Sequence, residues 1–192
     1  MDIIDSVQDI QNRLLDWFIT NGRHWIPWKL KKDGSTPEPG ECISPYEIWI
    51  AEVMLQQTQL NVVIPYWEKW MQTFPTLINL ADAGQQEVLF VWQGLGYYSR
   101  AKRIHQTSKI LINLVGKSNS LNYSLWPFEL HQWMAFPGIG RSTAGSIISS
   151  AFNLPEPILD GNVKRIFSRL IASNTLKNEK RFWHLSTYLL PT

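Results

Sequence analysis

Hydrophobic residues recur every three or four positions along most of the chain, which is the spacing of amphipathic helices. The first such stretch predicts a helix over residues 5–19. No stretch alternates between apolar and polar residues over enough positions to indicate a half-buried strand. The pattern therefore predicts an all-α fold of about ten short helices.

Proline, glycine and capping residues predict where the later helices begin and end. Ser44, Pro45 and Glu47 form a strong start, with an N-cap, a proline at the first helical position and an acid three residues after the cap. That helix is expected to continue through Gln59, and Pro65 is a candidate start of the next one. The other predicted helices span 77–82 after Thr76, 85–92, 99–115, Pro127 to about 135, 141–152, and a last clear one capped by Asp160.

One residue of the helix predicted over 44–59 departs from its pattern. Glu52 lies four residues after Ile48 and three before Leu55, so it shares a face with apolar residues. An apolar setting disfavours the charged carboxylate and raises its pKa, and a raised pKa suits a general acid. A carboxylate at the edge of that face, reaching solvent, is the alternative that the pattern taken alone favours.

The stretch 136–169 carries two further features. A Pro-Gly-Ile-Gly turn at 137–140 opens a helix, and Asp160 begins another about 20 residues later. Glycines allow close approach of the backbone, and exposed N–H groups at a helix start attract an anion such as phosphate. Phe136 and Ile139 are placed to pin two helices together. A helix-hairpin-helix that grips a nucleic-acid backbone has these features, and so does an ordinary helix–helix turn with glycines.

Composition narrows the class of protein. The 192 residues are 44% hydrophobic, which is enough for a packed core in one large domain or two small ones. Cys42 is the single cysteine, which excludes an internal disulfide and a cysteine-ligated metal site within the chain. No apolar run is long enough to span a membrane and no signal peptide is visible, so an intracellular protein is expected.

Charge is distributed unevenly along the chain. Residues 1–96 contain six Lys or Arg and twelve Asp or Glu, a net charge of −6. Residues 97–192 contain twelve Lys or Arg and four Asp or Glu, a net charge of +8. A basic half suits a polyanionic partner such as DNA, although charge alone fits solvated faces at least as well.

Glu52 and Asp160 are the candidate catalytic pair. Cleavage of a glycosidic bond needs an acid that protonates the leaving group and an anion that stabilises or attacks the cationic sugar. A Glu in an apolar setting and an Asp at a helix start can divide these roles. A base inside a duplex is out of reach, so such an enzyme must flip it out.

The chain resembles the helix-hairpin-helix DNA glycosylase superfamily and, within it, the MutY-type adenine DNA glycosylases. The resemblance extends from about Trp17 to Ala172. It rests on Trp28 and on PYEIWIAEVMLQQTQ (45–59), VIPYWEKW (63–70), FPT (74–76), WQGLGYYSRA (92–101), FPGIGRSTAGSI (136–147) and ILDGNVKRIFSR (158–169). It implies an all-α fold with a six-helix-barrel core and removal of adenine mispaired with 8-oxoguanine or guanine in double-stranded DNA.

The resemblance also assigns roles to residues at matching positions. Glu52 is the acid that protonates the adenine ring nitrogen, Asp160 stabilises or captures the oxocarbenium ion, and Asn162 lies beside that Asp. The remaining assignments are Gln57 and Tyr97 as wedges in the duplex, Thr58 and Leu95 near 8-oxoguanine, Trp28 and Lys29 in the adenine pocket, and Gly138, Gly140 and Ser142 on a phosphate. Lys29 departs mildly from the family, which often has Arg there.

Ser142 bears on the reaction class. Lyase-active relatives of the endonuclease III type have at this position a Lys that attacks the sugar, and Ser cannot form the imine. A monofunctional glycosylase is therefore expected. The family often binds a monovalent cation at the hairpin, and it normally carries a four-cysteine [4Fe–4S] cluster whose ligands this chain does not contain.

The resemblance predicts three parts: 1–43 as an N-terminal helix and loop, 44–159 as the barrel with the hairpin at about 128–150, and 160–192 as the start of a second subdomain. Members normally continue into the cluster motif and a domain that recognises 8-oxoguanine, so a truncated form is expected, monomeric and cytoplasmic if bacterial. Two alternatives stand beside the adenine glycosylase: a truncated, non-catalytic DNA-binding remnant, and a lyase-type glycosylase for oxidised pyrimidines.

Overall fold

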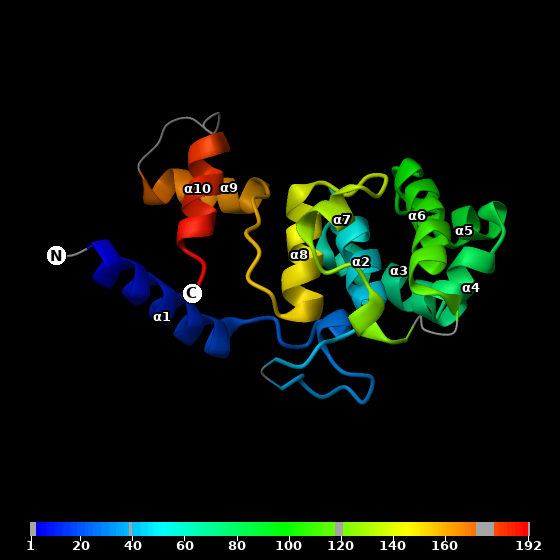
Figure 1. Ribbon diagram of the computed structural model, residues 1–192, viewed down its shortest axis with the longest axis horizontal. Coiled ribbons are helices and arrows are strands. Elements are labelled where there is room, and N and C mark those ends of the chain that lie inside the picture. The colour runs from blue at the N-terminus through cyan, green and yellow to red at the C-terminus, as the bar shows by residue number, and fades with distance from the viewer. Residues whose placement is uncertain (1–2, 39, 118–120, 172–178, 192) are drawn as a thin grey trace.

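The computed structural model describes residues 3–38, 40–117, 121–171 and 179–191, which form helices and no β-strand (Figure 1). The helices are α1 (Ile3–Asn21), η1 (Pro27–Lys29), α2 (Pro45–Leu55), α3 (Leu60–Thr73), α4 (Leu77–Asp82), α5 (Gln85–Val91), α6 (Ser99–Val115), η3 (Tyr123–Leu125), α7 (Leu130–Met134), α8 (Arg141–Phe152), α9 (Gly161–Leu170) and α10 (Glu179–Tyr188). The prediction of an all-α fold is confirmed. None of the helices in these ranges combines the length and apolarity needed to cross a bilayer.

Helix α2 forms the centre of the core. Eight of its eleven residues are buried, and it packs against α8, α3, α6 and η1. A helix that is apolar on nearly all sides belongs in the interior, where neighbours cover every face. The Ser44 hydroxyl caps it by accepting a hydrogen bond of 3.2 Å from the Glu47 N–H, as the sequence predicts.

The predicted hairpin joins α7 to α8. Phe136 and Ile139 are both buried in the main core, so they do fix the two helices against it. Gly138 has a φ of +80°, and a Cβ there would lie 2.6 Å from the Cδ of Arg103. The turn therefore needs glycine at this position both for its backbone angle and for the space it leaves to α6.

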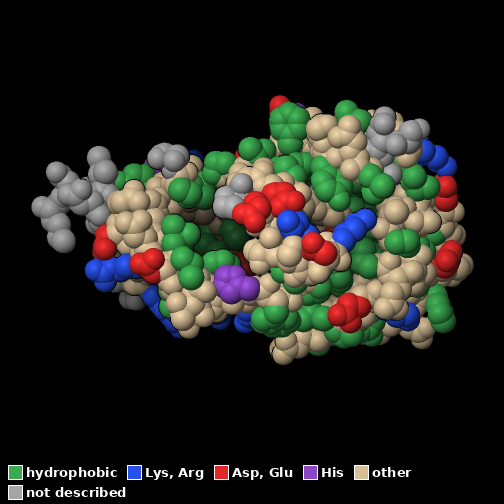
Figure 2. Space-filling model, turned by 90° about the horizontal axis from the view of Figure 1, so that it is seen from below, with side chains coloured by type: hydrophobic (Ala, Val, Ile, Leu, Met, Phe, Trp, Pro, Cys, Tyr) green, Lys and Arg blue, Asp and Glu red, His purple; other side chains and the backbone are tan. Residues whose placement is uncertain are grey.

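Helices α9 and α10 pack on each other around a small separate cluster of Leu159, Phe167 and Phe182. On α1, by contrast, several large hydrophobic side chains lie exposed: Leu14, Leu15, Trp17, Phe18 and Ile19. In the view from below, hydrophobic side chains surround a hollow in the left half of the molecule, the half in which α1 lies (Figure 2). The domain boundaries inferred from the resemblance stay a prediction.

Several predicted helix boundaries are wrong. Helix α7 begins at Leu130 rather than at Pro127, and α1 and α5 differ from their predicted bounds by one or two residues. Helix α2 ends at Leu55 rather than Gln59, because Gln56 leaves the helical conformation with a ψ of 111° and Gln57 follows with a left-handed φ of +58°. Helix α3 begins at Leu60 and contains Pro65 in its interior. Proline has no N–H for the Asn61 carbonyl, so the helix continues with one hydrogen bond fewer. Helices α4, α6 and α8 have the predicted bounds, whereas α10 was not foreseen.

Candidate active site

A cleft of about 780 Å³ opens between the end of α2, the first half of α8 and the segment that leads into α9. Glu52, Ser142, Ser146, Asp160 and Asn162 all line it. The structure therefore brings together the three candidate catalytic residues, Glu52, Asp160 and Asn162. More than 100 positions separate Glu52 from Asp160 in the sequence. The size falls within the range of small-molecule sites and is large enough for one flipped base.

Glu52 is half-buried and projects from α2 into this cleft. Burial raises the pKa of its carboxyl above the ordinary value, and the Asp160 carboxylate contributes in the same direction. A hydrogen bond with Ser146 and the charge of Lys29 act in the opposite direction on the Glu52 pKa. Burial is the largest of these causes, so the carboxyl is held in the setting that favours its protonated, proton-donating form.

Asp160 lies in a different setting, at the exposed start of α9. Its Oδ1 accepts a hydrogen bond of 2.8 Å from the Val163 N–H, and its Oδ2 accepts one of 3.3 Å from the Asn162 side-chain amide. Asn162 in turn accepts a hydrogen bond from Arg165. The predicted helix cap is confirmed, and the Asn162 amide holds the carboxylate in a fixed direction.

Ser142 connects the hairpin helix to this acidic side of the cleft. Its Oγ accepts a hydrogen bond of 3.0 Å from the Leu159 N–H, one residue before Asp160. At the turn itself, the Gly138 carbonyl accepts a hydrogen bond of 3.3 Å from the Gln56 side chain, and Gly140 caps α8. The phosphate and monovalent-cation contacts of these residues stay predictions.

The residues predicted to contact the duplex lie on two turns. Thr58 lines the cleft, and Gln57 next to it is exposed. On the second turn Leu95 is buried, while Tyr97 is 62% exposed and has a φ of +48°. Both wedge candidates therefore point outward from a left-handed backbone conformation.

The predicted base pocket is arranged differently from its sequence assignment. Trp28 is only 2% exposed and packs against Trp67 in the core, so it does not line the cleft. Lys29 is exposed, and its charge acts on Glu52. Arg23 and Trp25 of the same loop line the cleft instead, and no periodicity singled them out. Ser146 was also missed, although it lies one helical turn after Ser142 and therefore on the same face.

The residues present do not fit a cluster held by four cysteines. Cys42 is the single cysteine of this sequence and is exposed. Within the described ranges, no three His, Cys, Asp or Glu side chains come together as a metal site.

Comparison with known proteins identifies the family. Residues 50–190 match the family described as HhH-GPD superfamily base excision DNA repair protein. The adenine DNA glycosylase of Buchnera aphidicola subsp. Baizongia pistaciae is 39% identical over 180 residues, covering 93% of this chain and 46% of that protein. The human adenine DNA glycosylase is 35% identical over 192 residues, covering 97% of this chain and 33% of that protein. The chain thus spans less than half the length of either relative.

Solved structures support the same fold. A thermostable thymine-DNA glycosylase superposes with a TM-score of 0.78 at 19% identity, covering 99% of this chain and 81% of that one. A non-covalent endonuclease III–DNA complex superposes with a TM-score of 0.67 at 19% identity, covering 97% and 78%. By sequence and by fold, the chain belongs to the HhH-GPD superfamily of base excision DNA repair proteins and is related over most of its length to adenine DNA glycosylases.

Proposed function

We propose that this chain is a monofunctional DNA glycosylase that hydrolyses the glycosidic bond of adenine mispaired with 8-oxoguanine or guanine. The observation that carries the proposal is the placement of Glu52 and Asp160 in one cleft with unlike surroundings. Glu52 lies where burial favours the protonated carboxyl, and Asp160 lies at an exposed helix start with both oxygens accepting hydrogen bonds. Such a division between an acid and an anion is what glycoside hydrolysis requires.

The two carboxyl groups divide the steps of the reaction. Glu52 donates its proton to a ring nitrogen of the extruded adenine, so that the base leaves as a neutral molecule. The bond between that base and C1′ breaks, and the sugar is left as an oxocarbenium ion. The negative charge of Asp160 stabilises this cation until water adds to C1′, and the proton released by the water restores Glu52.

Ser142 favours simple hydrolysis over strand cleavage. Its hydroxyl is committed to the Leu159 N–H, and a serine cannot form the imine that links a lyase to its substrate. The Ser142 side chain therefore fixes the segment that carries Asp160 and supplies no amine nucleophile to the cleft.

The test of this function is single-turnover release of adenine from a duplex with adenine opposite 8-oxoguanine. We expect release that leaves an intact abasic strand, and no covalent DNA adduct after borohydride treatment. Duplexes with adenine opposite thymine and with an oxidised pyrimidine serve as controls. A borohydride-trapped adduct would favour a lyase, and absence of release by folded protein would contradict the proposal.

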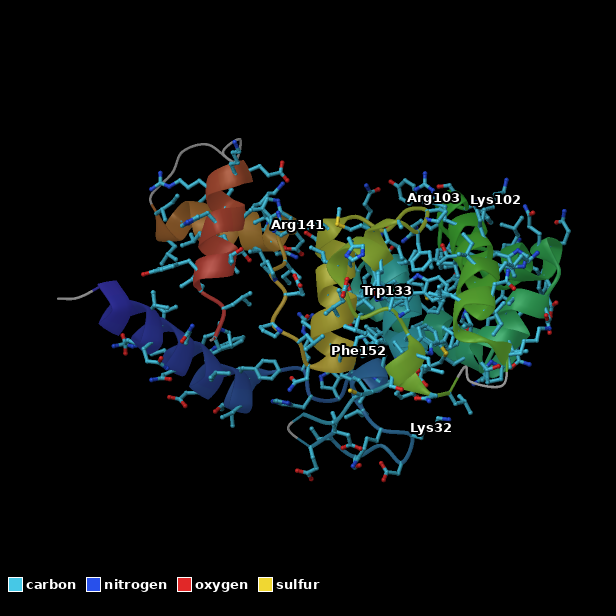
Figure 3. All side chains as sticks on the ribbon, viewed as in Figure 1. Lys32, Lys102, Arg103, Trp133, Arg141 and Phe152 are labelled. Atoms are coloured by element: carbon cyan, nitrogen blue, oxygen red, sulfur yellow. The ribbon has the colours of Figure 1, made fainter. Side chains whose placement is uncertain are left out.

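DNA binding through the basic half is the second part of the proposal. Lys102 and Arg103 lie at the start of α6, and Arg141 begins α8, along one edge of the molecule (Figure 3). The Arg103 side chain reaches the hairpin glycine Gly138. Arg103 and Arg141 border the N-terminus of α8, where exposed N–H groups suit a phosphate, and Lys102 precedes Arg103 on α6.

The Lys102→Gln variant is expected to weaken DNA binding with little dependence on sequence. Each phosphate contact that is lost should reduce the slope of log K against log salt concentration by about 0.9. Lys117→Gln is the matched control, because Lys117 follows the same helix and pairs with Asp82 at 2.8 Å. Fluorescence anisotropy over a salt series measures both slopes. An unchanged slope for Lys102→Gln would remove this residue from the DNA contact.

A further inference from the structure

Arg100 is a buried cation that the proposed chemistry does not use. It lies near the start of α6 and is only 5% exposed. Its Nη1 donates to three backbone carbonyls at the end of α2: Val53 at 3.1 Å, Met54 at 2.8 Å and Gln56 at 2.6 Å. The last carbonyls of a helix have no N–H partner within the helix. The Arg100 guanidinium supplies the missing hydrogen-bond donors.

The other end of the guanidinium contacts a second loop. Arg100 Nη2 donates to the carbonyls of Leu95 and Gly96, each at 3.3 Å, and to the Thr58 hydroxyl at 3.2 Å. One planar group therefore joins the turn at 56–58 to the turn at 95–97. We call this arrangement the Arg100 clamp. Lysine could not reproduce it, because an ammonium group is a point donor without the fork.

The clamp contains no counter-ion. In the described ranges, Arg100 makes no ion pair with a carboxylate, and its charge faces the rings of Trp92 and Tyr97 at 5.2 and 5.4 Å. Burying a cation away from water is costly, and core packing alone is better served by an apolar side chain. The arrangement is therefore poorly explained by stability alone.

The two joined turns are the ones that carry Gln57 and Tyr97. Gln57 has a φ of +58° and Tyr97 a φ of +48°, and both side chains are exposed. A left-handed backbone is unfavourable at a residue other than glycine and persists only where its surroundings impose it. The carbonyls just before each of these residues, those of Gln56 and Gly96, are bound by Arg100.

We propose that Arg100 is a positioning residue that sets the spacing and direction of Gln57 and Tyr97, so that the two side chains enter a duplex together when a base is extruded into the cleft. This role depends on the glycosylase function proposed above. Arg100 itself lies beneath the turns and contacts neither the base nor the sugar. Its effect on catalysis is indirect, through the geometry of the two exposed side chains.

The Arg100→Lys variant tests the clamp with the charge retained. We expect single-turnover base release to fall by about ten- to a hundredfold, because displacement of binding groups by about 1 Å has effects of this size. Fluorescence of 2-aminopurine at the target site should show less base extrusion. Arg13→Lys, an exposed arginine on α1, is the matched control. Release and extrusion equal to wild type in folded Arg100→Lys would overturn the proposal.

A double-variant cycle separates positioning from general destabilisation. If Arg100 acts through Tyr97, then Arg100→Lys should cost little further activity in a Tyr97→Ala background. A general loss of stability would instead add its full cost in that background. Full additivity of the two changes would therefore overturn the proposal.

Hydrogen exchange tests the clamp whether or not the chain releases adenine. Thr58→Val removes the one side-chain acceptor that Arg100 Nη2 uses and leaves the backbone acceptors in place. We expect faster amide exchange at 95–97, across the clamp, in this variant. Unchanged exchange there would overturn the clamp even if the proteins carrying Arg100→Lys failed to fold. Faster exchange without adenine release would support the clamp and contradict the function.

Discussion

Glu52→Gln is expected to lose adenine release by about a thousandfold while DNA binding stays close to wild type, since general acid catalysis contributes about 10²–10⁴-fold. Glutamine has nearly the shape of glutamic acid and fits the same wall of the cleft. It cannot transfer a proton to the leaving base, so adenine would have to depart as an anion. Single-turnover kinetics and anisotropy on the same duplex measure the two effects separately.

Glu47→Gln is the matched control for this change. Glu47 is a half-buried glutamate of the same helix, burial raises its pKa as well, and it does not line the cleft. Its amide variant should release adenine at the wild-type rate. Equal losses in both variants would mean that α2 is merely sensitive to substitution, and full release by Glu52→Gln would remove Glu52 from the acid role.

The melting temperature of Glu52→Gln gives an independent check on the raised pKa of Glu52. Burial raises the folded-state pKa of Glu52 above 4.5, so the stabilising protonated form is fully present below that value and is lost as pH rises through the raised pKa. Glutamine does not titrate. The melting temperature of the variant relative to wild type should therefore rise as the pH increases from 4.5 through the raised pKa. A relative melting temperature that falls over this range would contradict the raised pKa.

Asp160→Asn is expected to reduce adenine release by about a hundredfold or more, because loss of a group aimed at charge in the transition state typically costs 10²–10³ in rate. The change removes the negative charge that we propose stabilises the cationic sugar. It keeps the helix cap, since asparagine caps as well as aspartate does and can still accept from the Val163 N–H. Asp160→Asn therefore tests the role of the charge in the reaction without removing the helix cap.

Two comparisons sharpen this result. Asp160→Ala removes both the charge and the cap, so it should lose a similar amount of activity and about 1 kcal/mol more stability than Asp160→Asn. Glu156→Gln changes a carboxylate in the same segment outside the cleft and should leave release unchanged. Wild-type release by Asp160→Asn, measured with the protein in excess over duplex, would contradict the role of the Asp160 charge.

Local chemistry explains what could be predicted. Helix α2 begins where Ser44, Pro45 and Glu47 place its start, and α9 begins after the Asp160 cap, because capping depends on residues within one turn. The placement of Glu52 on an apolar face needed only the helical period. These local features single out Glu52 and Asp160 as the candidate catalytic residues.

Contacts between distant segments explain what could not. The helix predicted through Gln59 stops at Leu55. There the carbonyls at the end of α2 accept hydrogen bonds from Arg100, which lies more than 40 residues later in the sequence. Trp28 lies in the core because Trp67 packs against it. Neither partner can be inferred from the local sequence around the residue that it constrains.

The sequence by itself determined most of the helices, the caps of α2 and α9, the hairpin turn and the kinds of group available for catalysis. Each of these depends on neighbours within about one or two turns. Only the tertiary structure decided that Glu52 and Asp160 line one cleft, that Glu52 is half-buried while Asp160 is exposed, and that Arg100 joins the turns of Gln57 and Tyr97. The reason is that desolvation and hydrogen bonding at a site depend on which distant segments fold against it.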